Sequence, residues 1–159
     1  MNPEDIITID LATYTKMQYP EVIFTHVANE RKTKTSTNSK GRNFSYEGNL
    51  LKKKGVRRGV SDMLYFEPRG IYHGLFIEIK VDSPFKRNGE LKAGNVRKKS
   101  SLHSYLNGES VEKSHLEIQH EFIQKMNERG YYACFAVGYE QCQEILDKYL
   151  ALRPKETLD

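Results

Sequence analysis

The chain has few cysteines and no long apolar segment. Its 159 residues include only two cysteines, Cys134 and Cys142, and they do not form a CxxC pair. This pattern argues against a disulfide framework or a zinc site and favours buried free thiols in a reducing compartment. No window approaches the roughly 18 apolar residues of a membrane-spanning helix, so the sequence predicts no membrane span.

The N-terminal segment also lacks a secretory signal, because residues 1–5 are acidic and no basic segment precedes an apolar run. We therefore expect a cytoplasmic, intracellular protein. Hydrophobic residues make up 38% of the chain and charged residues 29%, which is typical of a globular protein with long polar loops. The length predicts a single domain over residues 1–150, followed by a tail at 151–159.

Positive charge is concentrated in the middle of the chain. The formal net charge is +4, but residues 1–30 carry one Lys and five acids (net −4) and residues 100–159 carry six Lys/Arg and ten acids (net −4). Residues 31–99 carry 18 Lys/Arg and six acids, a net charge of +12. A polyanion partner, most naturally nucleic acid, explains this excess; a solvated lysine-rich surface is the alternative.

Hydrophobic periodicity predicts an α/β fold in the order αβ(α)ββαβα. Basic loops are expected at 28–45 and 82–112, and the apolar run at 131–137 indicates a buried strand, either central or parallel to a neighbour. This predicted order of elements implies a mixed central sheet flanked by helices. The predicted helices cover 4–18, 46–54, 113–129 and 140–150, with a short helix or turn at 100–107, and the strands cover 22–27, the two arms of 62–80, and 131–137.

The predicted hairpin at 62–80 carries two acids and a lysine. Because alternate residues of a strand face the same side, Glu78 and Lys80 project together while Ile77 and Ile79 enter a core. Folding the hairpin back brings Asp62 beside Glu78. Two carboxylates and an ammonium at one end of a sheet predict a site for a hard cation beside a charged catalytic group.

The ordered motifs resemble the PD-(D/E)xK nuclease superfamily and, within it, the stand-alone VRR-NUC domains of phages. The resemblance rests on Val-Arg-Arg-Gly-Val-Ser-Asp at 56–62, on the hairpin at 70–80 ending in Glu-Ile-Lys, on the segment 19–30, and on a helix containing Gln119. It covers most of residues 4–150 and implies a restriction-endonuclease-like three-layer core. It also implies a host-cell location if a phage encodes the chain.

The resemblance implies a metal-dependent nuclease site. Asp62 and Glu78 would bind Mg²⁺ or Mn²⁺, with the Ile79 carbonyl as a third oxygen, and Lys80 would assist the attacking water or stabilise the transition state. Gln119 would orient a water or a phosphate. Glu4 best matches the metal-associated glutamate of the first helix, and Asp5 and Asp10 are the alternatives.

Three features depart from the family pattern. Ser61 replaces a proline before the catalytic aspartate, and Leu116 occupies a position where a serine is expected, with Ser114 nearby. The segment between Lys80 and Gln119 is also longer than expected. We expect His26 to pack within its strand, and His115 has no metal-ligand spacing with any partner.

The implied activity is endonucleolytic cleavage of branched DNA, such as four-way junctions, by a homodimer. Nicking or flap cutting and a DNA-binding module without catalysis are the alternatives. Basic side chains close to the predicted site are expected to contact phosphates, and they set affinity rather than sequence choice. These residues are Lys52, Lys53, Lys54, Arg57, Arg58, Lys86, Arg87 and Lys98.

Overall fold

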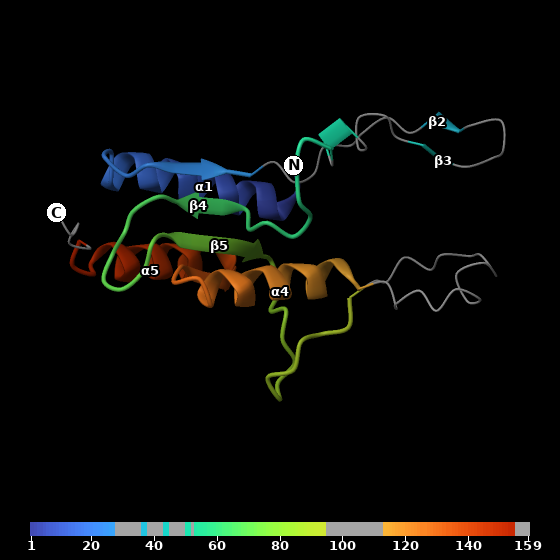
Figure 1. Ribbon diagram of the computed structural model, residues 1–159. Coiled ribbons are helices and arrows are strands. Elements are labelled where there is room, and N and C mark those ends of the chain that lie inside the picture. Colours follow the sequence, from blue (N-terminus) through green and yellow to red (C-terminus); the bar gives the residue numbers. More distant parts are fainter. Residues whose placement is uncertain (28–35, 38–42, 45–49, 52, 95–112, 155–159) are drawn as a thin grey trace.

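The computed structural model describes residues 1–27, 36–37, 43–44, 50–51, 53–94 and 113–154. Its main elements follow the predicted order, and Figure 1 shows a sheet with helices on both sides. The elements of this body are α1 (Pro3–Gln18), β1 (Phe24–His26), β4 (Met63–Tyr65), β5 (Leu75–Lys80), α4 (His115–Asn127), β6 (Tyr132–Val137) and α5 (Gly138–Leu150).

The main sheet is mixed and has the strand order β1-β4-β5-β6. β1 pairs antiparallel with β4, and β4 pairs antiparallel with β5 to form the predicted hairpin. β6 runs parallel to β5, which confirms one of the two expectations for the apolar run; β6 lies at a sheet edge and is not central. Its sequence is still apolar throughout because α4 and α5 both contact it.

Helices cover the sheet from both faces. Leu11 of α1 and Leu146 of α5 pack on the face formed by Tyr65, Ile77 and Ile79, all of which are fully buried. On the opposite face, residues of α4 pack against the sheet; this second core contains Phe76, Ile123, Ala133, Phe122 and Phe135. The predicted three-layer, restriction-endonuclease-like architecture is therefore confirmed.

Both helices that border the site end of the sheet start at a capping box. Asn2 caps α1 and exchanges hydrogen bonds with the segment around Asp5, while Pro3 occupies the first turn, where its missing N–H costs nothing. Ser114 caps α4 together with Glu117 and is buried. The serine noted beside the expected family position therefore begins the helix.

Hydrogen bonds at a single carboxylate connect α1 to α5. The hydroxyl of Tyr14 donates to both oxygens of Asp147 (2.9 and 3.0 Å), and the hydroxyl of Tyr19 donates to Oδ1 (2.8 Å). Burial and the neighbouring Asp147 carboxylate raise the pKa of Tyr19 well above its usual value. These contacts hold α1 in place along the sheet.

Some predicted loops and helices differ from the structure or lie outside its described part. In the expected loop 28–45, β2 (Ser36–Thr37) pairs antiparallel with β3 (Asn43–Phe44), a local pairing that sequence patterning did not indicate. Only Leu50, Leu51 and Lys53 of the predicted helix 46–54 are described as helical. The turn or helix predicted at 100–107 lies outside the described residues, as do positions 95–112 of the second basic loop.

The described residues bear on two predictions, one about the cysteines and one about membrane-spanning helices. Both cysteines are free thiols; Cys142 is buried and Cys134 is partly buried. Burial raises the pKa of each thiol to about 12, which keeps both protonated. None of the helices in the described part of the chain combines the length and apolarity that a membrane crossing requires.

Candidate active site

The site lies where β4 begins and β5 ends. Met63 is opposite Ile77 in the antiparallel register, so Asp62, one residue earlier, reaches the level of Glu78. The Oδ2 atom of Asp62 accepts a hydrogen bond from the backbone N–H of Ile79 (2.9 Å). The predicted meeting of Asp62 with the end of the second arm is present, and Ile77 and Ile79 are fully buried on the other face as expected.

Glu78 is the most deeply buried acid of the site, with 1% of its surface exposed. Its Oε1 atom accepts hydrogen bonds from Lys80 Nζ (2.8 Å) and from Gln119 Nε2. Its Oε2 atom is buried and has no hydrogen-bond partner among the described residues. Burial and the Asp62 carboxylate raise the pKa of Glu78 to about 8, although Lys80 opposes that rise.

Asp62 is half-buried, and its partial burial raises its pKa despite the hydrogen bond from Ile79 and the charge of Lys80. His26 of β1 also borders this residue. Its Nδ1 atom lies 3.0 Å from the Asp62 carbonyl oxygen, and the ring is exposed rather than packed within the strand as predicted. The β1–β4 pairing places His26 opposite Met63, which is why sequence patterning alone missed this contact.

Gln119 reaches Glu78 from α4 on the opposite layer. It is 6% exposed, and its Nε2 atom also lies 3.1 Å from His115 Nε2. Sequence reasoning missed His115 because it considered metal-ligand spacing alone. The available signal was the four-residue separation, which places His115 and Gln119 on one helix face.

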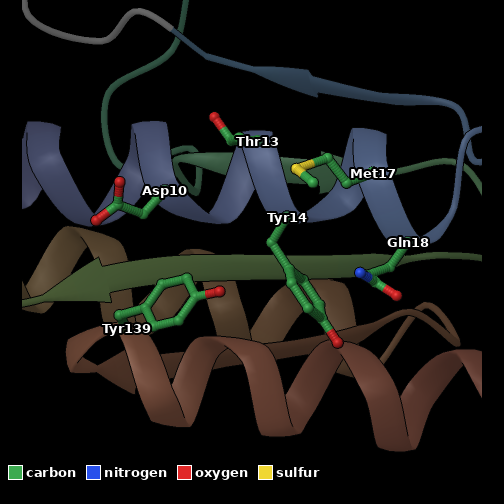
Figure 2. Close-up of a pocket in the computed structure, with 6 residues that line it drawn as sticks. All are labelled: Asp10, Thr13, Tyr14, Met17, Gln18 and Tyr139. Atoms are coloured by element: carbon green, nitrogen blue, oxygen red, sulfur yellow. The ribbon is translucent and has the colours of Figure 1, made fainter.

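Of the three acids considered on α1, Glu4 contributes to the electrostatics of Glu78. Its negative charge contributes to the raised pKa of Glu78, which places it near the site. Asp5 instead accepts a hydrogen bond from the N-cap backbone (3.2 Å). Asp10 lines a groove of about 330 Å³ between α1 and α5, into which Tyr14 and Tyr139 project; this groove contains neither Asp62 nor Glu78 (Figure 2).

The predicted phosphate contacts are exposed where the structure describes them. Lys53, Lys54, Arg57 and Arg58 precede Asp62 in the chain, and Arg87 follows Lys80. Lys86 is also exposed, but it forms an ion pair with Glu90 (2.9 Å), which neutralises part of its charge. The remaining two, Lys52 and Lys98, lie outside the described residues.

The donor set of the site fits a hard divalent cation. Asp62 and Glu78 offer carboxylate oxygens. The Oε2 atom of Glu78, which accepts no hydrogen bond from the described residues, needs a proton or a cation to offset its burial. Within the described ranges, no three His, Cys, Asp or Glu side chains converge tightly enough to hold a metal by themselves. Mg²⁺ and Mn²⁺ suit this arrangement, because Mg²⁺ commonly binds through one or two carboxylates and keeps several waters.

The fold and the site together define a class of architecture: a three-layer α/β fold with two acids and a lysine at one end of its sheet. A solved structure described as a VRR_NUC domain protein shares this fold. It is 23% identical, the match covers 98% of this chain and 94% of that one, and the TM-score is 0.57. No protein-family model and no curated protein matches the sequence. The likeness shows a VRR-NUC-like fold.

Proposed function

We propose that this protein is a divalent-metal-dependent endonuclease that hydrolyses phosphodiester bonds in branched DNA. The observation that carries the proposal is the buried carboxylate Glu78 beside Asp62, which is held through Oε1 and has no hydrogen-bond partner at Oε2 in the described part of the chain. The VRR-NUC-like fold of the similar structure supports a nuclease. The positive charge of residues 31–99 supports a nucleic-acid substrate.

Each side chain has a role in this proposal. Asp62 and Glu78 would hold Mg²⁺ or Mn²⁺, and Glu4 and the Ile79 carbonyl are further proposed contacts of the ion or its waters. When bound, such an ion supplies Lewis-acid activation of a phosphodiester and lowers the pKa of a water. Lys80, whose Nζ atom lies 2.8 Å from Glu78, would stabilise negative charge that develops on the phosphate.

The decisive experiment is cleavage of labelled four-way junction, flap, nicked and duplex DNA with and without Mg²⁺ or Mn²⁺. We expect junction cleavage that requires the metal and falls at least about a hundredfold in Asp62→Ala and in Lys80→Ala. Matched controls are Asp82→Ala, an exposed acid two residues after Lys80, and Lys125→Ala, on the exposed surface of α4. Both controls are expected to retain wild-type activity.

The alternative functions predict other outcomes of the same assay. Preferential cutting of flaps or nicked duplexes would identify a nuclease of different specificity on this scaffold. Binding without cleavage under any divalent ion would identify a DNA-binding module. Unchanged Mn²⁺-dependent cleavage by Lys80→Ala would show that the site assignment is wrong.

We also propose that the protein acts as a homodimer, because junction resolution needs two cuts and the described part of one chain carries one such site. Exposed apolar side chains on α1, namely Ile6, Ile9 and Met17, support a self-association surface. Sedimentation of the wild-type chain would show a dimer, and Ile9→Asp would shift it to a monomer. A monomeric wild type that resolves junctions contradicts this part of the proposal.

A further inference from the structure

We propose that His115 is a positioning residue that holds the Gln119 amide so that Glu78 directs Oε2 toward the metal. This inference rests on the proposed function, since it assigns a task within the same site. His115 is exposed, Gln119 is 6% exposed and Glu78 is 1% exposed, so the three form a path from the surface into the buried site.

The chemistry of the three groups defines the direction of each hydrogen bond. A metal-binding Glu78 is an ionised carboxylate and can only accept, so the Gln119 amide must turn its NH₂ group toward it. That nitrogen carries two hydrogens and accepts none. One hydrogen reaches Glu78 Oε1, and the other can reach His115 Nε2 at 3.1 Å, which therefore acts as the acceptor.

This second hydrogen bond determines which oxygen of Glu78 is available. Lys80 and Gln119 both donate to Oε1, whereas Oε2 has no partner among the described residues. Without an acceptor at position 115, the amide can rotate its oxygen toward the carboxylate, and repulsion would then displace Glu78. Groups that orient metal ligands in this way typically change metal affinity or activity by about 10- to 100-fold when removed.

The same helix contains a matched pair that does not reach the site. His120 Nε2 lies 3.1 Å from Gln124 Nε2, with the same four-residue separation and the same residue types. Gln124 is exposed, and the His120 ring stacks against Phe135. His120→Phe therefore removes an equivalent hydrogen bond from α4 while keeping an aromatic ring.

The test measures Mn²⁺ binding to the full chain by electron paramagnetic resonance, and kcat and KM for junction cleavage. His115→Phe is expected to weaken Mn²⁺ binding about tenfold and to lower kcat, with an unchanged KM for DNA. His115→Gln supplies a side-chain oxygen that can accept the same hydrogen bond, so it is expected to restore both quantities to within about threefold of wild type. His120→Phe is expected to change neither.

Thermal unfolding of each variant checks that the fold is retained. Wild-type Mn²⁺ affinity and kcat in His115→Phe would overturn the inference while leaving the proposed nuclease intact. Equal losses in His120→Phe would also overturn it, because the effect would then belong to α4 in general. His115-dependent Mn²⁺ binding without cleavage of any DNA would refute the nuclease and leave the positioning role standing. A wild type that binds no Mn²⁺ would refute both.

Discussion

Glu78 combines deep burial with an incomplete set of hydrogen bonds. Removing a carboxylate from water without full compensation destabilises its charged form, which is why the pKa of Glu78 is raised to about 8. The neighbouring Asp62 carboxylate adds to the rise. Without a bound cation, the folded protein therefore favours a protonated Glu78 at neutral pH.

The raised pKa predicts a pH-dependent stability of the metal-free protein. The pKa of Glu78 is higher in the folded than in the unfolded chain, so its stabilising effect is complete below about pH 4 and is lost as pH rises through about 8. Glu78→Gln removes the ionisation and keeps a similar shape. We expect the variant to exceed wild type by roughly 4 kcal/mol at pH 8.5 and by roughly 1 kcal/mol at pH 5.

Urea unfolding in the presence of a chelator measures this difference at each pH. Glu90→Gln is the matched control, because Glu90 is exposed and Lys86 lowers its pKa rather than raising it. The control is expected to show no gain over wild type as pH increases. A constant difference between Glu78→Gln and wild type from pH 5 to 8.5 would contradict the raised pKa.

At the scale of elements, a close contact between Gly59 and α4 determines where the turn before β4 lies. Gly59 has a φ of +77°, and a Cβ atom there would lie 2.7 Å from Ile118 Cγ2 and 3.0 Å from the Ile118 backbone. Ile118 directly precedes Gln119. The same close approach therefore brings the segment that carries Asp62 and the helix that carries Gln119 to one place.

Gly59→Ala should separate these two segments. Gly55 is the matched control, because its φ is +88° and a Cβ atom there has nothing within 4 Å. We expect Gly55→Ala to cost about 1 kcal/mol from backbone strain alone, and Gly59→Ala to cost about 3 kcal/mol because overpacking adds to that strain. The free energy of unfolding in urea measures both, and equal losses in the two variants would show that the Ile118 contact is unimportant.

At the scale of the whole molecule, the charged segments converge on one end of the sheet. Residues 53–62 lead into β4 at this end, and residues 81–94 leave β5 from it (Figure 1). The N-terminus of α4 lies there too. Exposed cations, among them Arg57, Arg58 and Arg87, lie on the segments that enter and leave this end of the sheet.

This arrangement predicts salt-sensitive DNA binding. Cations that neutralise phosphates release counterions, so we expect the junction Kd to rise at least about tenfold between 50 and 200 mM salt. Replacing both Arg57 and Arg58 with Ala should reduce the slope of log Kd against log salt by about 2. Lys148→Ala, on α5, is the control and should leave the slope unchanged. A flat salt response of the wild type would contradict the basic approach to the site.

Most of the fold could be predicted because its signals are local. Helical periodicity and capping residues located α1, α4 and α5 to within a few residues, and the turn residues Pro68 and Gly70 marked the β4–β5 hairpin. The position of β6 at the sheet edge was not predictable, because helices on both faces make an edge strand as apolar as a central one. The β2–β3 pairing was missed since its strands are two residues each.

The sequence by itself determined the hairpin that places Asp62, Glu78 and Lys80 at one end of a sheet, because strand alternation and hairpin geometry act over a few residues. Only the tertiary structure decided which atoms of these side chains form hydrogen bonds. The approach of α4 makes Glu78 Oε1 the bonded oxygen and leaves Oε2 without a hydrogen bond from any residue that the structure describes, and the β1 pairing brings His26 to Asp62. These contacts join residues far apart in the chain, and their geometry depends on how the layers pack.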